Sequence, residues 1–551
     1  MIYIYIFFSV IIYSLFLYPR VIHLLKRFSI VDIPDNRKIH KEITPRMGGI
    51  IIYLAIIIVL FIFYNNLDKI RLVFISTFPI VFCGIIDDIW GLTWDKKLIL
   101  QSMTAFLLIL FYTPFMEPMS FFDLALVPPL NYIVMFLFII GTLNAINMMD
   151  GLDGLVGGFS LVIFAIMLPL AYFANDAFLL VLTVAIVGAI IGFLKYNAYP
   201  AQIFLGDTGS LVIGLFLIIA SLSISIDLKQ HIDLTLPIIL LGIPIIDTLK
   251  VIFIRIFNGK NPFMPDKNHL HHVFLEYKIG HKMTVFYIQI LSLVSVFITF
   301  IYLRTSIYAA FILFFISILF IVFVRKILTI FSKAPFQRKI EKASQFPVYF
   351  IMLFKKGIIP VTVLITIIVL YSTLEINRVV SNHEIILIVC FLTLLLILSI
   401  YRNIKWSGYS EFYVLICWIV YFIFTTQEIG IMKDFSTYQY NIRYLIHLIS
   451  LVTLSINIIL FLSLRKELFT QRVSILNGFD LIIVTIICLM FILRGFLQYQ
   501  FPVYIGIDML HAFLFYLSYK IMISLKPSLT KILFYGSFAI SVSALLYQLL
   551  L

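Results

Sequence analysis

Apolar runs about as long as a membrane-spanning helix follow one another along almost the entire chain. An α-helix rises about 1.5 Å per residue, so roughly 20 apolar residues cross the hydrocarbon core of a bilayer, and a helix satisfies its own backbone hydrogen bonds there. The runs have this length and lack the alternating pattern of a membrane-barrel strand. We therefore predict an all-α protein, a polytopic transmembrane helical bundle of about eighteen helices.

The charge of the chain supports a membrane location and argues against nucleic-acid binding. Only 12% of the residues are charged, whereas the share in a soluble domain is about a quarter. The net charge of +13 comes from Lys and Arg residues that gather in loops, where they set topology and attract anionic lipid. The lipid bilayer is thus an expected partner, and no nucleic acid is expected. The four cysteines stand singly, so they predict neither disulfides nor a zinc site.

Basic residues indicate on which side of the membrane each loop lies. The first apolar run, Ile2 to Tyr18, has no basic stretch before it and no small-residue cleavage site after it, so we interpret it as a retained helix. Basic residues cluster directly after this run, which places the N-terminus outside. With alternate threading, the basic loops at Lys96-Lys97, Arg255 to Lys282 and Arg325 to Lys342 all fall on the cytoplasmic side.

A polar stretch after residue 330 divides the chain, and every polar motif precedes it. We predict a membrane domain at residues 1–330, a cytoplasmic linker at 331–346 and an additional transmembrane domain at 347–551, with about eleven helices in the first domain and about seven in the last. The helices expected in the first domain span residues 2–24, 48–64, 71–86, 98–114, 130–147, 155–174, 177–194, 210–226, 235–257, 284–303 and 306–324.

Four short polar islands interrupt the apolar sequence of the first domain. They are Asp87-Asp88, Asn144 to Asp153, Gly206 to Ser210 and Asp266 to His272. By alternation of the helices, all four fall on the cytoplasmic face, whereas the outer loops carry acids without a recurring glycine or histidine pattern. We therefore expect the islands to converge on one site. Carboxylates, small residues and histidines suit a metal-dependent site for a phosphorylated substrate.

The spacing within the second island predicts a shared helix face. Asn144, Asn147, Asp150 and Asp153 recur every third residue as the fifth helix ends. The alternative is a polar helix end with a glycine cap. In the first island, the neighbours on a helix point about 100° apart, so two distinct roles are expected unless both are solvated acids at a helix end.

The remaining two islands suggest contacts with phosphate. Asp207 precedes a helix expected to begin near Ser210, whose free N–H groups favour an anion, although Asp207 could equally be a helix cap. The histidine cluster has no cysteine pair and is therefore unlike a structural zinc site. His269, His271 and His272, with Arg255 nearby in the sequence, suit contacts with a diphosphate or sugar; ordinary loop histidines are the alternative.

Five runs of the sequence resemble, in order, the motifs of the polyprenyl-phosphate N-acetylhexosamine-1-phosphate transferases. The resemblance covers residues 1 to about 325 and is carried by DNRKIH…TPRMGGI, GIIDDIWGL…KKLILQ, NAINMMDGLDGL, FLGDTGS and P…D…R…NPFMPDKNHLHH. It implies transfer of a sugar 1-phosphate from a UDP-N-acetylhexosamine to undecaprenyl (polyprenyl) phosphate, giving a polyprenyl-diphosphate sugar and UMP. This reaction initiates lipid-linked synthesis of cell-envelope glycans such as teichoic acid or lipopolysaccharide O-antigen.

The resemblance also implies a cofactor, a location and roles for particular residues. It implies Mg²⁺ or Mn²⁺, and a multi-pass protein of the bacterial inner (cytoplasmic) membrane with its active site on the cytoplasmic face. The HLHH form is similar to the GlcNAc-type branch and differs from the uninterrupted triple histidine of the UDP-MurNAc-pentapeptide branch. The implied roles are catalysis by Asp87 and Asp88, metal binding by Asp207, and substrate binding by Asn144, Asn147, Asp150, Asp153, Arg255, His269, His271 and His272.

Elementary chemistry limits the mechanism of such a transfer. A phosphate monoester has a second pKa of about 6, so the lipid phosphate is mostly dianionic at neutral pH and hardly needs a strong general base. Charge neutralisation should dominate, with a divalent ion on Asp207 and with Asp88 positioning or deprotonating the lipid phosphate. A two-step route through an aspartyl phosphate remains an alternative to direct transfer.

A transporter or flippase for a nucleotide sugar or lipid-linked sugar is the rival function. Transporters place their sites near the bilayer midplane, in helices broken at corresponding positions of two halves. Here the polar clusters lie at one face and only in the first half, which favours the enzyme.

The second half of the chain carries no motif that identifies its role. The candidates are a scaffold, a homodimer surface, a platform for downstream glycosyltransferases and a lipid-handling module. Asp508 and His511 would share a helix face at membrane depth, either as a functional pair or as a packing pair. Because all proposed site residues precede the linker, we predict that a chain ending within Lys333 to Ser344 retains the transfer activity.

Overall fold

The computed structural model describes most of the first half of the chain and parts of the second. The described residues are 2–32, 43–64, 66–259, 267–333, 393, 414–419, 454–455, 458, 480–481, 483–487, 503–525 and 530–550. The chain forms two compact units, one of Met1–Pro335 with Asn477–Leu489 and one of Phe336–Leu476 with Met490–Leu551. Within the described residues, nine helices are long and apolar enough to cross a membrane. The predicted all-α, polytopic membrane fold is confirmed, whereas the predicted domain boundaries stay a prediction.

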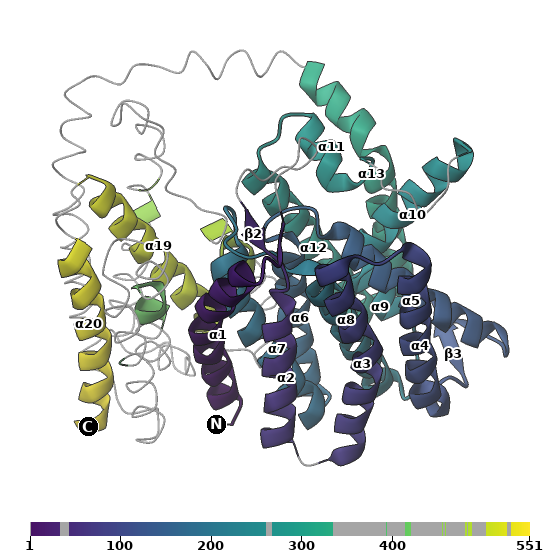
Figure 1. The fold of residues 1–551 in the computed structure, drawn as a ribbon, viewed down its shortest axis with the longest axis horizontal. Coiled ribbons are helices and arrows are strands. Elements are labelled where there is room, and N and C mark those ends of the chain that lie inside the picture. The colour runs from purple at the N-terminus through teal and green to yellow at the C-terminus, as the bar shows by residue number, and fades with distance from the viewer. Residues whose placement is uncertain are drawn as a thin grey trace. The chain divides into compact units, whose positions relative to one another are not determined.

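The helices of the first unit match the predicted segments closely (Figure 1). They are α1 Ile2–Arg27, α2 Gly49–Phe63, α3 Leu67–Trp90, α4 Trp94–Tyr112, α5 Leu130–Met149, α6 Leu155–Phe173, α7 Ala177–Asn197, α8 Gly206–Lys229, α9 Thr235–Leu240, α10 Gly242–Phe257, α11 Leu270–Glu276, α12 His281–Arg304 and α13 Ile307–Lys333. A 3₁₀ turn at Thr113–Phe115 follows α4. Two short antiparallel pairs complete the unit: β1 Val31–Asp32 with β2 Thr44–Pro45, and β3 Met119–Phe121 with β4 Leu124–Leu126.

One predicted helix is broken. The segment expected as a single helix over 235–257 forms α9 and α10, which meet at Leu241. Pro244 has no N–H to donate to the carbonyl of Leu240, and its ring would clash with that carbonyl. Pro244 is tolerated in the first turn of α10, where its N–H would have no partner within the helix. The prediction of one continuous helix was therefore wrong. Neither α11 nor the two strand pairs was expected from the sequence.

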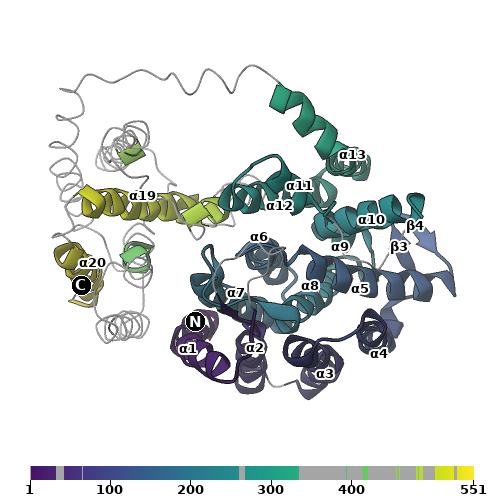
Figure 2. The same ribbon diagram turned by 45° about the horizontal axis from the view of Figure 1, so that its top comes forward.

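The core of the first unit is formed by α6, α7 and α8, whose residues are mostly buried. Figure 2 shows α8 with α5, α6 and α7 beside it and α3 on its other side. At the periphery, α4 and α13 leave large apolar side chains exposed, among them Phe106 and Phe311. In a bilayer these side chains meet lipid, which is as apolar as they are. The arrangement is that of a membrane bundle.

Glycines bring α2 and α3 into backbone contact with the first turn of α8. A Cβ added at Gly49 would overlap the Cα of Gly209, and a Cβ added at Gly84 would overlap the Cα of Thr208. Small residues allow such close helix approach in membranes. The start of α8 is thereby fixed beside the last turns of α3, where the first polar island lies.

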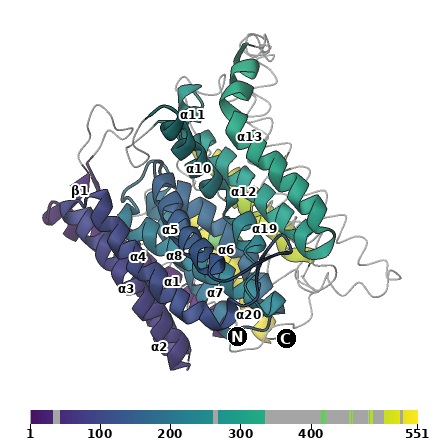
Figure 3. The same ribbon diagram turned by 90° about the vertical axis from the view of Figure 1, so that its right-hand side faces the viewer.

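The short helix α11 lies at one end of the first unit. Figure 3 shows it at the end of α12 and close to α10. The histidine motif lies at the start of α11, between α10 and α12 in the chain. The other islands lie at the ends of α3 and α5 and at the start of α8.

A short helical stretch from the second half of the sequence belongs to the first unit. Thr485 is buried, and its Oγ1 donates a hydrogen bond of 3.0 Å to Oε1 of Gln289 on α12. A truncation before this stretch removes the partner of a buried amide. This contact was not expected from the sequence.

The second unit contains α19 Val503–Leu525 and α20 Thr530–Leu550. Trp418 stacks on Phe515 of α19, with ring centroids 4.7 Å apart, and Ser541 Oγ of α20 donates to the carbonyl of Cys417 at 2.7 Å. His511 is buried on α19, but the side chain of Asp508 lies outside the described residues, so the predicted pairing of the two stays a prediction. Most of the seven helices expected in this half also lie outside the described residues.

Candidate active site

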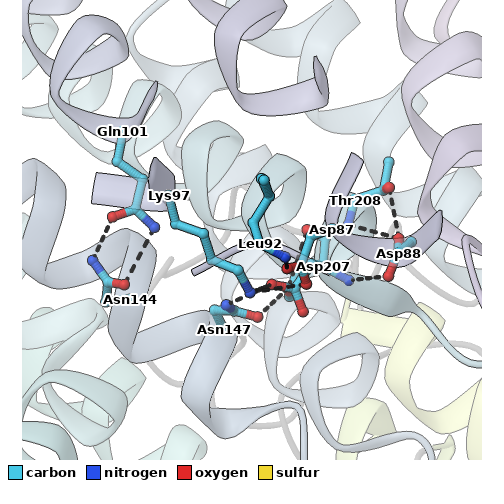
Figure 4. Close-up of polar contacts among 10 residues, drawn as sticks. Asp87, Asp88, Leu92, Lys97, Gln101, Asn144, Asn147, Asp207 and Thr208 are labelled. Atoms are coloured by element: carbon cyan, nitrogen blue, oxygen red, sulfur yellow. Dashed lines mark hydrogen bonds and ion pairs between the residues drawn. The ribbon is translucent and has the colours of Figure 1, made fainter. Parts of the chain in front are cut away.

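The first and third polar islands meet where α3 ends and α8 begins (Figure 4). Asp87 and Asp88 were expected after a helix, but α3 continues to Trp90, so both lie in its last turn. Asp207 was expected before a helix, but α8 begins at Gly206, so Asp207 lies in its first turn. Because both helices are longer than expected, all three aspartates belong to helices and not to loops or caps.

The carboxylate of Asp88 caps the start of α8. Its Oδ1 accepts a hydrogen bond from the N–H of Asp207 at 2.9 Å, and its Oδ2 accepts from Thr208 N at 3.1 Å and Thr208 Oγ1 at 2.7 Å. Gly206 has a φ of +74°, and a Cβ there would overlap the carboxylate of Asp88. The N-terminus of α8 was expected to bind an anion. For the N–H groups of Asp207 and Thr208, that anion is the carboxylate of Asp88.

Lys97, on the first turns of α4, joins the first island to the third. Its Nζ lies 2.8 Å from Oδ2 of Asp87 and 2.6 Å from Oδ2 of Asp207. The other oxygen of Asp87 accepts from the N–H of Leu92 at 2.7 Å. Two carboxylate oxygens therefore converge on one cationic atom. From the sequence, Lys97 was used for topology and within the motif run KKLILQ, but it was given no role in the site. A lysine at the start of an apolar helix, ten residues after Asp87, was the signal available.

Asn147 joins the second island to the third. Its Nδ2 donates to Oδ2 of Asp207 at 3.1 Å, and its Oδ1 accepts from Ser210 Oγ at 2.8 Å. Asn144, one turn earlier on α5, pairs reciprocally with Gln101 of α4 at 2.7 and 3.2 Å. Asn144 thus holds α4 against α5, and its predicted role in substrate binding stays a prediction.

The second island does not lie on one helix face throughout. Because α5 ends at Met149 and Asp150 has a non-helical ψ of 53°, the three-residue spacing keeps only its first two members on one face. The expectation for the last two was therefore wrong. Asp153 accepts a hydrogen bond from the N–H of Ala201 at 3.0 Å, which ties this loop to the segment leading into α8.

The carboxyl group of Asp150 lies in a negative environment. Desolvation, and after it the charges of Asp207, Asp88 and Asp153, raise the pKa of Asp150 well above its usual range. A carboxyl group with a raised pKa inside an acidic cluster is typical of a functional site. The same environment favours any cation that enters.

Asp247 of α10 positions the histidine motif. Its carboxylate accepts hydrogen bonds from Lys250 Nζ at 2.6 Å and from the N–H of Leu270 at 2.9 Å, and lies 3.0 Å from Nδ1 of His269. An ionised carboxylate only accepts, so Nδ1 of His269 is the donor. From the sequence, Asp247 was part of the motif run P…D…R but was given no role. An acid and a base three residues apart in an apolar helix were the signal.

His271 brings the fourth island against the second. A Cβ added at Gly151 would overlap its Nε2, so the loop after α5 touches the imidazole through a glycine that has no side chain to separate them. Burial, and after it the charge of His272, lower the pKa of His271 to about 3, so that the ring is neutral at neutral pH. The ring of His272 lies 4.3 Å from that of His271.

Arg255 is buried in the last turn of α10. The contact between His271 and Gly151 joins the fourth island to the others, which confirms the expectation that all four converge. Among the residues that the structure describes, no three or more His, Cys, Asp or Glu side chains are grouped so as to hold a metal ion by themselves.

Comparison with known proteins agrees with this architecture. Residues 70–225 match the model of glycosyl transferase family 4. The chain is similar to a probable undecaprenyl-phosphate N-acetylglucosaminyl 1-phosphate transferase of Bacillus subtilis, with 33% identity over 284 residues, 50% of this chain and 78% of the relative.

Two further relatives come from other bacteria. An undecaprenyl-phosphate alpha-N-acetylglucosaminyl 1-phosphate transferase of Thermotoga maritima is 31% identical over 49% of this chain and 80% of its own length. A phospho-N-acetylmuramoyl-pentapeptide-transferase of Caldicellulosiruptor bescii is 34% identical over 42% of this chain and 76% of its own length.

The helical membrane bundle with its acid and lysine cluster thus defines a class, the polytopic membrane transferases. Within that class, the chain belongs to glycosyl transferase family 4. The family resemblance inferred from the motifs is confirmed.

Proposed function

We propose that this protein transfers N-acetylhexosamine 1-phosphate from a UDP-sugar to undecaprenyl phosphate, giving a polyprenyl-diphosphate sugar and UMP. The observation that carries the proposal is the convergence of Asp87 and Asp207 on one cationic atom, Lys97 Nζ, at the shared end of α3, α4 and α8. One ammonium between two carboxylates leaves a net negative charge, so this centre can attract a divalent cation, which would offset the negative charge of two phosphate-bearing substrates. Relatives from several bacteria are named as transferases of this kind.

The sugar is proposed to be N-acetylglucosamine. The histidine motif reads HLHH, the form of the GlcNAc-type branch. Overall identity does not decide between the branches, because relatives named for either sugar are 31 to 34% identical to this chain. The histidine motif therefore carries the assignment, and a panel of UDP-sugars tests it.

The acid cluster fits a divalent ion of the Mg²⁺ type. Magnesium takes oxygen ligands and is held by one or two carboxylates, with water and substrate phosphates completing its octahedron. Oδ2 of Asp87 and Oδ2 of Asp207 already lie within 2.8 Å of one cation, the ammonium of Lys97. We propose that Asp207, with Asp87 beside it, holds Mg²⁺ or Mn²⁺. When bound, the ion would supply charge stabilisation for the diphosphate and the leaving UMP.

The chain's own side chains divide the remaining work. Asp88 gives both oxygens to the N-terminus of α8, so we propose that it positions Asp207 instead of touching the lipid phosphate. Asn147 orients the carboxylate of Asp207. Neutral His271 is proposed to donate a hydrogen bond to the sugar or diphosphate, and His269, whose Nδ1 donates to Asp247, is proposed to contact the sugar through Nε2.

The topology proposed for this reaction follows the charge bias of the loops. The N-terminus lies outside, and the active site faces the cytoplasm, where the basic loops are. The multi-pass membrane location itself is supported by the nine spanning helices among the described residues.

A product assay tests the proposal. Purified full-length protein in detergent, given undecaprenyl phosphate, UDP-GlcNAc and Mg²⁺, is expected to release UMP and to form a lipid-linked diphosphate sugar. Release of UDP would indicate ordinary glycosyl transfer instead. A second assay uses the protein reconstituted in vesicles. Accumulation of unaltered UDP-sugar inside them, without release of UMP or UDP, would favour the transporter.

A further inference from the structure

Lys97 is the single cation that contacts both acids of the proposed metal site among the described residues. Its side chain is only 22% exposed, and its Nζ bridges Oδ2 of Asp87 and Oδ2 of Asp207 (Figure 4). The neighbouring Lys96 is exposed. The burial of Lys97 between two carboxylates singles it out from the basic residues that set topology.

The oxygen that Lys97 contacts most closely belongs to Asp207, the carboxylate that is proposed to hold the divalent ion. Oδ2 of Asp207 receives the ammonium at 2.6 Å and the amide of Asn147 at 3.1 Å. A Mg²⁺ ion binds a carboxylate oxygen at about 2.1 Å. An ammonium and a divalent ion on the same oxygen would repel each other at close range in a partly desolvated site. The two cations therefore compete for Asp207.

The chemistry of lysine suits an exchange. The ammonium is a compact point charge with three rotatable donors on a flexible stem, so it can leave one acceptor and keep another. In the described residues, two of these donors go to Asp87 and Asp207. An ammonium displaced from Asp207 can therefore remain at Asp87.

We propose that Lys97 is an exchangeable counter-ion of the metal site. It offsets part of the negative charge of Asp87 and Asp207 before the divalent ion binds, and then yields Oδ2 of Asp207 to that ion. This inference rests on the proposed function, because it requires a divalent ion at Asp207. It assigns Lys97 a role in setting metal affinity, which neither the motif resemblance nor the family match provides.

Metal binding without substrate tests the inference. The free Mn²⁺ concentration is measured by electron paramagnetic resonance during titration of full-length protein in detergent, for wild type, Lys97→Met and Lys96→Met. Loss of the competing charge should tighten Mn²⁺ binding to Lys97→Met by about tenfold, a difference of about 1.4 kcal/mol. Lys96→Met removes the same charge from an exposed position and should bind Mn²⁺ like wild type.

The stability of the same proteins gives a second readout. In EDTA, Lys97→Met should melt at a lower temperature than wild type, because the carboxylates lose their counter-ion, and Mn²⁺ should raise its melting temperature more than that of wild type. If Lys97→Met does not fold, Lys97→Gln carries the same prediction with a polar side chain of similar length.

The outcomes separate this inference from the proposed function. Equal or weaker Mn²⁺ binding by a folded, uncharged Lys97 variant overturns the counter-ion role while leaving the metal site intact. Absence of Mn²⁺ binding in every variant, wild type included, contradicts the metal assignment itself. Asp207→Asn is the control that should lose binding in either background.

Discussion

The cap that Asp88 forms on α8 leads to a quantitative prediction for Asp88→Asn. The carboxylate accepts three hydrogen bonds from Asp207 and Thr208. An asparagine has one acceptor oxygen, so whichever way its amide is turned, at least one N–H or O–H group of α8 faces an NH₂ group. A lost hydrogen bond to a charged group contributes about 1.5–3 kcal/mol, and the lost charge at the helix N-terminus adds about 0.3–1 kcal/mol. We expect destabilisation of about 3 kcal/mol.

Thermal unfolding in detergent measures this loss, and Thr208→Val is the matched control. That variant removes only the hydrogen bond from Oγ1 and keeps the charged cap, so it should cost about 1 kcal/mol. Turnover of Asp88→Asn should fall as well, because Asp207 loses its position. An Asp88→Asn protein that melts like wild type but has no turnover would refute the reasoning, since it would show that Asp88 acts on substrate.

Three further predictions follow from particular contacts. Gly151→Ala should reduce turnover by about tenfold or more, because its Cβ would overlap the imidazole of His271, whereas Gly141→Ala on the same island's helix meets no atom within 4 Å and should retain activity. His271→Gln should flatten the dependence of the melting temperature on pH between about 6.5 and 3. In wild type, a pKa lowered to about 3 means that the unfolded state binds the extra proton in that window, so stability falls as pH falls, by up to about 1.4 kcal/mol per pH unit. A chain ending in the linker should keep measurable transfer but melt earlier than the full chain, because Gln289 loses the hydrogen bond from Thr485. In that shortened chain Gln289→Leu should recover stability, and the opposite result would show that other contacts of the second half are decisive.

The helices could be predicted from the sequence because length and hydropathy alone determine them in a bilayer. The ranges expected for α5, α6 and α7 agree with the structure within a few residues. The break at Leu241 was missed because the sequence is apolar on both sides of it, from Leu236 to Ile246. The signal for a break is the effect of Pro244 on the carbonyl of Leu240.

The convergence of the islands could also be predicted, since alternate threading places every one of them at the same end of the bundle. The individual contacts could not. Whether Asp88 faces α8 or a ligand depends on how α3 packs against α8. The residues next to Asp88 in the sequence do not determine that packing. Lys97 was missed for the same reason, because its acceptors come from other helices.

The position of the β-phosphorus after reaction tests the central claim most directly. With UDP-GlcNAc labelled by ³²P in the β-phosphate, wild-type protein, undecaprenyl phosphate and Mg²⁺, sugar-1-phosphate transfer moves the label into the lipid fraction and leaves unlabelled UMP. Asp207→Asn should leave the label in the UDP-sugar, while Lys96→Met should transfer it as wild type does. Label recovered in UDP, with an unlabelled sugar on the lipid, would contradict the account, because the enzyme would then break the bond between sugar and phosphate instead of the bond within the diphosphate.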